Sequence, residues 1–404
     1  MSTTSTTTLP SLSPAELSYL HTSLSHPHHP IRTDGRSATQ FRPLSAETGI
    51  LPGANGSARI GFADGTQAIV GVKGEVERTG LGSGGEVVGG LGLEGGEEGE
   101  GEGGSKGRRG GGRGEWVEMS IEIPGLRDDD PLPVFLAEMM REGLVGSGAG
   151  GEGEEEGRLK ERLVINQGWH WRIYIDILLL SPPLSYPLPL LSLTTHLALL
   201  STKLPKLKSK DEEDPMFDDD WAAAEYLYPR RTTHTTSTSA TQQITTHPFR
   251  PPVTLLVIAV GDNIIFDPSR EEIAVAEAVL AVTVGRTTNF NSNHNNKDVS
   301  EASTLKLLSI RTIDPPSRLT SPGIPNKENA ATIGFAVTGA GEGEEVRAVE
   351  GGAAVDAGED VAGVWSPRRG GVKRAVIARI VRMVLKRGGV GEEVLEGLEG
   401  VEVG

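Results

Sequence analysis

The chain has 404 residues, a formal net charge of −16, no cysteine and only 4% aromatic residues. The lack of cysteine excludes disulfides and thiolate chemistry. Three acidic segments, 151–157, 210–220 and 341–361, together account for the whole net charge, so the rest of the chain is close to neutral. The overall acidity therefore describes low-complexity segments and does not exclude a nucleic-acid partner.

The N-terminal region predicts a short helix. Residues 13–16 (Ser-Pro-Ala-Glu) form a capping box with proline at the first helical position. Leu17, Leu20 and Leu24 then fall on one helical face. Residues 1–10 have neither a charged nor an apolar segment, so we expect no secretory signal.

A charged turn at Arg32, Asp34, Gly35 and Arg36 precedes an antiparallel meander that is predicted over about residues 40–77. The meander consists of strand-like runs that are separated by turn residues. Arginine side chains pair well with carboxylates and backbone carbonyls. We therefore interpret these four residues as a structural turn that the two arginines hold in place.

A glycine-rich tract covers residues 80–115, of which 18 are Gly. Its backbone entropy excludes a packed element, and a strand follows at 116–124, so the tract is predicted to be a loop inserted into a hairpin. Dinucleotide binding is unsupported, because G-x-G-x-x-G matches arise by chance here and the tract does not join a strand to a helix. The basic piece at 106–114 is similar to an RGG-type nucleic-acid segment. A passive solvated loop is favoured, because six Glu lie just upstream.

The later elements follow from apolar periodicity and from composition. The stretch 177–202 has no charged residue but contains four prolines, so a buried strand and helix are favoured over a membrane span. The apolar run 273–284 fits helix or strand by periodicity, and its hairpin context favours strand. In chain order we expect a helix at 131–144, a disordered insert at 146–157, a strand at 169–180, a helix at 190–203, a disordered linker at 209–247, strands at 253–260 and 264–267, weak structure over 289–341 and a helix at 372–387.

Several candidate chemical sites in the sequence have simpler structural explanations. His28 and His29 are flanked by prolines and lack further metal ligands, so an extended connector is favoured. The aspartates at 128–130 suit a helix N-terminus, and those at 218–220 lie in the linker, so neither run predicts Mg²⁺ binding. The basic helix at 372–387 could bind a phosphate backbone or a membrane surface, but packing of its apolar face on a sheet is favoured. We expect no metal and no cofactor.

Short motifs in a fixed order resemble the RNase PH-type domain, and more narrowly the ribosomal-RNA-processing protein forty-two type of the eukaryotic RNA exosome ring. Each motif is weak alone, and their order and spacing carry the resemblance across about 200 residues. The motifs are Arg32-Thr33-Asp34-Gly35-Arg36, Phe41-Arg42-Pro43, Asn55-Gly56-Ser57-Ala58-Arg59, Val70-Gly71-Val72-Lys73, Gly168-Trp169, Asp176-Ile177-Leu178-Leu179, Leu204-Pro205, Pro251-Pro252-Val253 and Phe266-Asp267-Pro268 with Glu271-Glu272.

The resemblance implies an α/β (α+β) fold of two β-α units with mixed or antiparallel sheets and packed helices. It places the first unit at 30–208 and the second at 248–404, with an N-terminal helix and tail at 1–29. Disordered inserts are expected at about 80–115 and 146–157, and a long low-complexity insert at about 289–365. These bounds are expectations from the motifs and from composition.

The resemblance also implies a catalytically inert subunit. Phosphorolytic relatives carry a Leu-Asp-Leu-type acidic motif that ends in Glu-Asp, with a further Asp downstream. The corresponding place here is 265–273, where Pro268 interrupts the strand and the downstream Asp is missing. The general acid or base that phosphorolysis needs is therefore not in place. An active phosphate-dependent 3′-to-5′ exoribonuclease and a stand-alone RNA-binding scaffold are the alternatives.

The implied function is a non-catalytic exosome ring subunit that supports RNA processing and degradation. The implied partners are other RNase PH-type subunits in a hetero-hexameric ring, cap subunits with S1 or KH domains, and RNA, without a membrane. The implied location is the nucleus and nucleolus, and also the cytoplasm. Arg141, Lys73 and Arg59 are the candidate RNA-contacting residues; the alternative for Arg141 is a surface arginine in a salt bridge.

Overall fold

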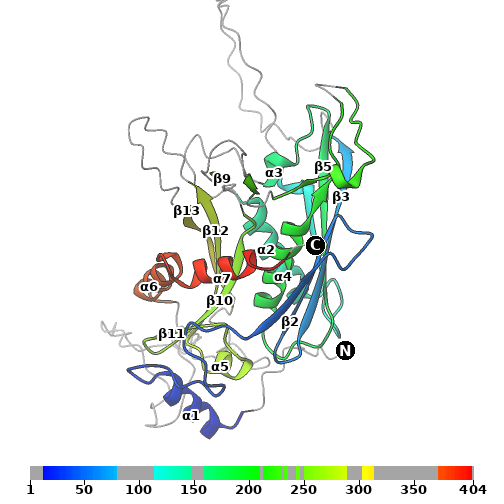
Figure 1. Ribbon diagram of the computed structural model, residues 1–404. Coiled ribbons are helices and arrows are strands. Elements are labelled where there is room, and N and C mark those ends of the chain that lie inside the picture. The colour runs from blue at the N-terminus through cyan, green and yellow to red at the C-terminus, as the bar shows by residue number, and fades with distance from the viewer. Residues whose placement is uncertain are drawn as a thin grey trace, which may run out of the picture. The chain divides into compact units, whose positions relative to one another are not determined.

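The computed structural model divides into two compact units (Figure 1). One unit comprises Met1–Phe41, Leu256–Ala281 and Ile310–Arg382, and the other comprises Arg42–Leu255, Val282–Ser309 and Met383–Gly404. We call them unit 1 and unit 2. The described residues are 12–79, 113–146, 159–209, 213–228, 232–234, 243–245, 250–288, 303–313 and 372–402.

A five-stranded sheet in unit 2 contains the predicted meander. Its order is β1-β2-β3-β5-β4, and all pairings are antiparallel except that between β4 and β5. The strands are β1 (Leu44–Thr48), β2 (Gly56–Phe62), β3 (Gln67–Arg78), β4 (Val117–Glu122) and β5 (Trp169–Leu179).

The predicted hairpin between β3 and β4 is wrong. β5 lies between these strands, pairing with β3 from Ala68 to Arg78 and in parallel with β4. The physical reason is the burial of apolar surface. A central strand buries more of its apolar surface than an edge strand does, and three isoleucines of β5 are almost completely buried: Ile173, Ile175 and Ile177. Residues 80–112 of the glycine-rich tract lie outside the described residues.

Helices α2 (Pro131–Val145) and α4 (Leu188–Ser201) lie on the same side of this sheet, as Figure 1 shows. α4 packs on β2 and β3, and α2 packs on β4. Every residue of α4 is buried, which agrees with its lack of charged residues. A short helix, α3 (Leu159–Arg162), and a 3-10 turn, η1 (Gly114–Trp116), flank these elements.

The predicted disorder of residues 209–247 is wrong for part of that segment. Tyr228 is completely buried, and the ring of Phe217 lies 5.0 Å from that of Trp171. Aromatic burial therefore offsets the acidic composition locally. The elements of the region are β6 (Lys203–Leu204), η2 (Trp221–Ala223), β7 (Glu225–Tyr226), β8 (Thr232–His234) and β9 (Gln243–Thr245).

A second sheet has the order β11-β10-β12-β13. Its strands are β10 (Val253–Val260), β11 (Asn263–Phe266), β12 (Ala278–Thr288) and β13 (Ser303–Thr312). The described C-terminal helices are α6 (Arg374–Leu385), which was predicted, and α7 (Val390–Glu399), which was not.

Two sequence expectations for this region need correction. The run 273–284 is not one strand, because the helix α5 (Arg270–Ala274) precedes β12 and begins at a capping box formed by Ser269 and Glu272. Weak structure over 289–341 is wrong at β13, whose run from Ser303 to Thr312 pairs with the sheet. The capping box of α5 stands directly before an apolar run, and β13 lies within a polar region, so neither element was expected.

Unit 1 contains α1 (Pro14–Leu24), with the predicted capping box present: the Ser13 backbone N–H donates to Glu16 Oε2 at 2.7 Å. Leu20 and Leu24 are its buried residues. Within the described ranges of the whole chain, no helix is long and apolar enough to cross a membrane.

We expect the stability of the protein to fall in mild acid because of His196 in α4. The side chain is 1% exposed, and burial lowers the pKa of His196 from 6.5 to about 4. Between these values the unfolded chain binds a proton that the folded chain does not, so the stabilisation is complete above pH ~6.5 and is lost as the pH falls toward ~4. Urea unfolding should show a loss of up to about 3 kcal/mol over this window, and His196→Gln should reduce the loss. An equal loss in both proteins would contradict the assignment.

Candidate functional site

The charged turn of unit 1 is anchored by a buried arginine. Arg32 has a side chain that is 0% exposed, and its Nε and Nη2 donate to the two carboxylate oxygens of Glu272, each at 2.8 Å. The same guanidinium donates to the backbone carbonyls of Phe266 (3.2 Å) and Asp267 (2.9 Å). The fork geometry of arginine thus binds both the start of α5 and the end of β11.

A second arginine binds the neighbouring carboxylate. Arg36 Nη1 donates to Asp267 Oδ2 at 2.8 Å, and its Nη2 donates to the Asp267 carbonyl at 3.1 Å. Arg36 Nε also donates to Asp34 Oδ2 at 2.6 Å, which closes the turn. Gly35 has φ +76°, a left-handed conformation that glycine adopts without a steric penalty. The four residues predicted to form a structural turn therefore lie together in one bonded cluster.

The backbone around Asp267 and Glu272 is fixed by further bonds. The Ser269 backbone N–H donates to Glu272 Oε2 at 2.8 Å, so Glu272 caps α5 while it binds Arg32. The Phe266 backbone N–H donates to the carbonyl of Ala38 at 2.8 Å. Asp267 has φ +47°, which is unusual for a residue with a side chain. These bonds hold an uncommon conformation at the point where Pro268 ends the strand.

Both carboxylates lack the access that acid–base catalysis needs. Asp267 is 0% exposed and Glu272 is 1% exposed. Each has a guanidinium at 2.8 Å. A general acid or base must reach the reacting group of a bound substrate. The arrangement therefore stabilises the fold of unit 1 and keeps Asp267 and Glu272 away from solvent.

Arg59 and Lys73 lie on one face of the five-stranded sheet of unit 2. Strand alternation places them opposite the buried side chains of Val70 and Val72. Lys73 is 60% exposed and binds Glu75 at 2.7 Å, and this bond raises the pKa of Lys73. Arg59 Nη2 donates to the side chain of Gln67 at 2.5 Å.

Arg141 lies apart from that pair, on α2. Its Nε and Nη2 donate to Glu138, each at 2.9 Å, which raises the pKa of Arg141, and its Nη1 donates to the Gly114 carbonyl at 3.1 Å. The side chain thus has the salt bridge that was the alternative to RNA contact. The structure does not bring the three candidate RNA-contacting residues together, and RNA contact by each stays a prediction.

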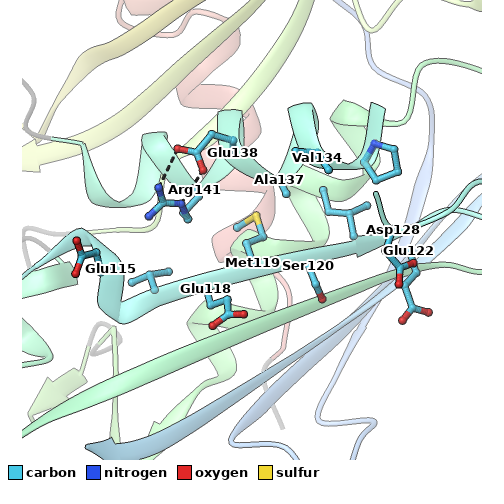
Figure 2. Close-up of a pocket in the computed structure, with 13 residues that line it drawn as sticks. Glu115, Glu118, Met119, Ser120, Glu122, Asp128, Val134, Ala137, Glu138 and Arg141 are labelled. Carbon is cyan, nitrogen blue, oxygen red and sulfur yellow. Dashed lines mark hydrogen bonds and ion pairs between the residues drawn. The ribbon is translucent and has the colours of Figure 1, made fainter. Parts of the chain in front are cut away.

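Arg141 also lines a groove of about 520 Å³ between β4 and α2, which we call the β4–α2 groove (Figure 2). Five carboxylates line it with this one guanidinium. The negative carboxylates repel a negative phosphate, so the surroundings of Arg141 disfavour an RNA backbone. The carboxylates are those of Glu115, Glu118, Glu122, Asp128 and Glu138. Across the described part of the chain, no group of three or more His, Asp or Glu could hold a metal ion.

The sequence reasoning missed the partners of the two arginines. A signal for one was present, because Ser269 and Glu272 have the spacing of a capping box. No local signal links Arg32 to Glu272, since 240 positions separate them. The pairing is a tertiary property of unit 1.

Two curated proteins are similar to this chain. Exosome complex component RRP42 of Saccharomyces cerevisiae is 27% identical over 278 residues, which cover 68% of this chain and 81% of the relative. Exosome complex component rrp42 of Schizosaccharomyces pombe is 29% identical over 288 residues, which cover 68% and 78%. The chain is similar to RRP42 over about two thirds of its length. This similarity confirms the resemblance that the motifs indicated.

No family model matches the chain. Among solved structures, the Archaeoglobus fulgidus exosome with RNA bound to the active site has a TM-score of 0.43 and 19% identity, covering 74% of this chain and 87% of that chain. No inference is based on a structural similarity with so low a TM-score. The predicted α/β class, with mixed and antiparallel sheets, is confirmed.

We expect removal of one partner of the buried pair to destabilise the protein strongly. Arg32→Met leaves Glu272 buried without a cation, which should cost about 3–5 kcal/mol in the free energy of unfolding. Urea unfolding measures this cost, and Arg32→Met/Glu272→Gln should lose less than Arg32→Met alone. Arg127→Met is the control, because the Arg127–Asp129 pair is 82% and 73% exposed and should contribute little. A double variant less stable than Arg32→Met would contradict the charge argument.

Proposed function

We propose that this chain is a non-catalytic ring subunit of an RNA exosome, where it supports 3′-to-5′ RNA processing and degradation. The observation that carries the proposal is the similarity to two RRP42 components over 68% of the chain and about four fifths of each relative. Its partners are other RNase PH-type ring subunits and the RNA that the assembly handles. Cap subunits with S1 or KH domains, and a location in nucleus, nucleolus and cytoplasm, belong to the same proposal.

The inert character of the subunit is supported by the cluster in unit 1. At the place that corresponds to the acidic motif of phosphorolytic relatives, Asp267 and Glu272 are buried and bound to arginines. A carboxylate in this state stabilises a fold and does not exchange protons with a substrate. Pro268 further fixes the backbone of the segment.

The isolated full-length chain should not shorten RNA. We expect poly(A) incubated with the protein and inorganic phosphate to keep its length and to release no nucleoside diphosphate, since no carboxylate reaches the substrate. Gel electrophoresis and ³¹P NMR measure the two products, and a phosphorolytic enzyme added to the same mixture is the positive control. Phosphate-dependent shortening of poly(A) by the isolated chain would establish the alternative, an active exoribonuclease.

Native purification should recover the chain in a stable complex. We expect mass spectrometry at native salt to identify other RNase PH-type proteins in amounts comparable to this chain. The reason is that the proposal places the subunit in a ring. If the chain instead purifies alone and binds RNA tightly, the proposal is wrong and the chain is a stand-alone RNA-binding scaffold.

A further inference from the structure

Among the described strands, β4 lies at the edge of the five-stranded sheet. It pairs with β5 on one side, and no other described strand pairs with it. An edge strand presents a row of backbone N–H and C=O groups that can accept another extended chain. α2 packs on β4 and forms the other wall of the β4–α2 groove.

The groove has an apolar floor on the α2 side of β4, and we call the carboxylates that line it the rim. Figure 2 shows Met119 on the α2 side of the strand, and Glu118 and Glu122 on the other side. The floor includes Val117, Met119 and Ile121 of β4, and Val134 of α2 is 53% exposed. On the strand, Glu118 and Glu122 are exposed and alternate with the floor residues. An incoming strand would therefore meet apolar side chains on the α2 side of β4, and Glu118, Ser120 and Glu122 on the other side.

The charge of the rim excludes two possible occupants. RNA would place phosphates beside five carboxylates, which is electrostatically unfavourable. A second copy of this chain, paired edge to edge, would set its own Glu118 and Glu122 against the same residues, and like charges on paired strands destabilise pairing.

The described basic residues near the groove do not neutralise it. Arg141 is bound to Glu138 at 2.9 Å. Arg172 reaches Glu118 at 3.0 Å, but it is shared with Glu77 at 3.2 Å. Neither Glu122 nor Asp128 has an ion pair among the described residues. The rim therefore keeps an excess of negative charge.

We propose that the β4–α2 groove binds an extended basic segment of a protein partner, which adds as a strand to the open edge of β4. Lysine or arginine side chains of that segment pair with the rim, and its intervening small apolar side chains contact the floor. Complementary charge selects such a partner and speeds its association. This inference goes beyond the proposed function and stands on the groove itself, whichever assembly the chain enters.

The test uses the full-length chain and a fluorescein-labelled peptide of alternating Lys or Arg and Val, about as long as the six residues of β4. We expect saturable binding by fluorescence anisotropy, weakened by salt because exposed charges are screened. Glu118→Lys/Glu122→Lys should weaken binding at least about tenfold, because two attractive charges become repulsive. Glu118→Gln/Glu122→Gln should weaken it less, and serves if the reversed variant fails to fold.

Two controls separate strand addition in this groove from general attraction to an acidic protein. Glu47→Lys/Glu75→Lys makes the same change in net charge elsewhere on the sheet, with Glu47 on the other edge strand, and should leave binding unchanged. A peptide that is N-methylated at alternate amides keeps its charge but loses backbone donors, and should bind at least about tenfold more weakly.

Three results would overturn the inference. The first is equal binding of the peptide to the groove variants and the control variant. The second is undiminished binding of the N-methylated peptide. The third is displacement of the peptide by oligo(A) RNA together with weaker RNA binding in the Glu118 and Glu122 variants, which would make the groove a nucleic-acid surface.

Discussion

The buried ion pair between Arg32 and Glu272 organises unit 1. It joins a turn near the N-terminus to a helix 240 positions later, and the neighbouring Arg36–Asp267 pair repeats the connection. Desolvation of charges is costly, so each pair is stable only because backbone carbonyls and the α5 cap satisfy the remaining donors and acceptors. Asp267 and Glu272 are thereby held inside the fold of unit 1.

Sequence periodicity predicted most elements but few of their neighbours. β5 was evident from the alternation of Ile173, Ile175 and Ile177. Its position between β3 and β4 was not, because period-two alternation identifies a strand face without identifying its partner. β13 was missed inside a polar region. The functional inference depended on the resemblance of short motifs. The carboxylate partners of Arg32 and Arg36 could not be predicted, because tertiary contacts that no local pattern encodes set these pairs.

Positive and negative side chains share the face of the first sheet that lies away from the buried side chains. Arg59 and Lys73 lie on the face away from the buried side chains, whereas Arg141 lies on α2 among carboxylates. The net charge of −16 is therefore a poor guide to any single surface. Glu118 and Glu122 share that face with Arg59 and Lys73, and the edge beside these two carboxylates suits a basic protein segment.

The discontinuity of unit 1 has a consequence for biosynthesis. Its described core requires residues 12–41 together with Leu256–Ala281, so contacts of long sequence separation must form before it is stable. Folding rates fall as contact order rises. During translation the N-terminal arginines emerge long before Asp267 and Glu272, and the turn waits without its carboxylate partners. Residues 1–281 of the 404 must be synthesised before residues 12–41 can pack against Leu256–Ala281, so the newly made N-terminal turn stays without these partners through most of translation.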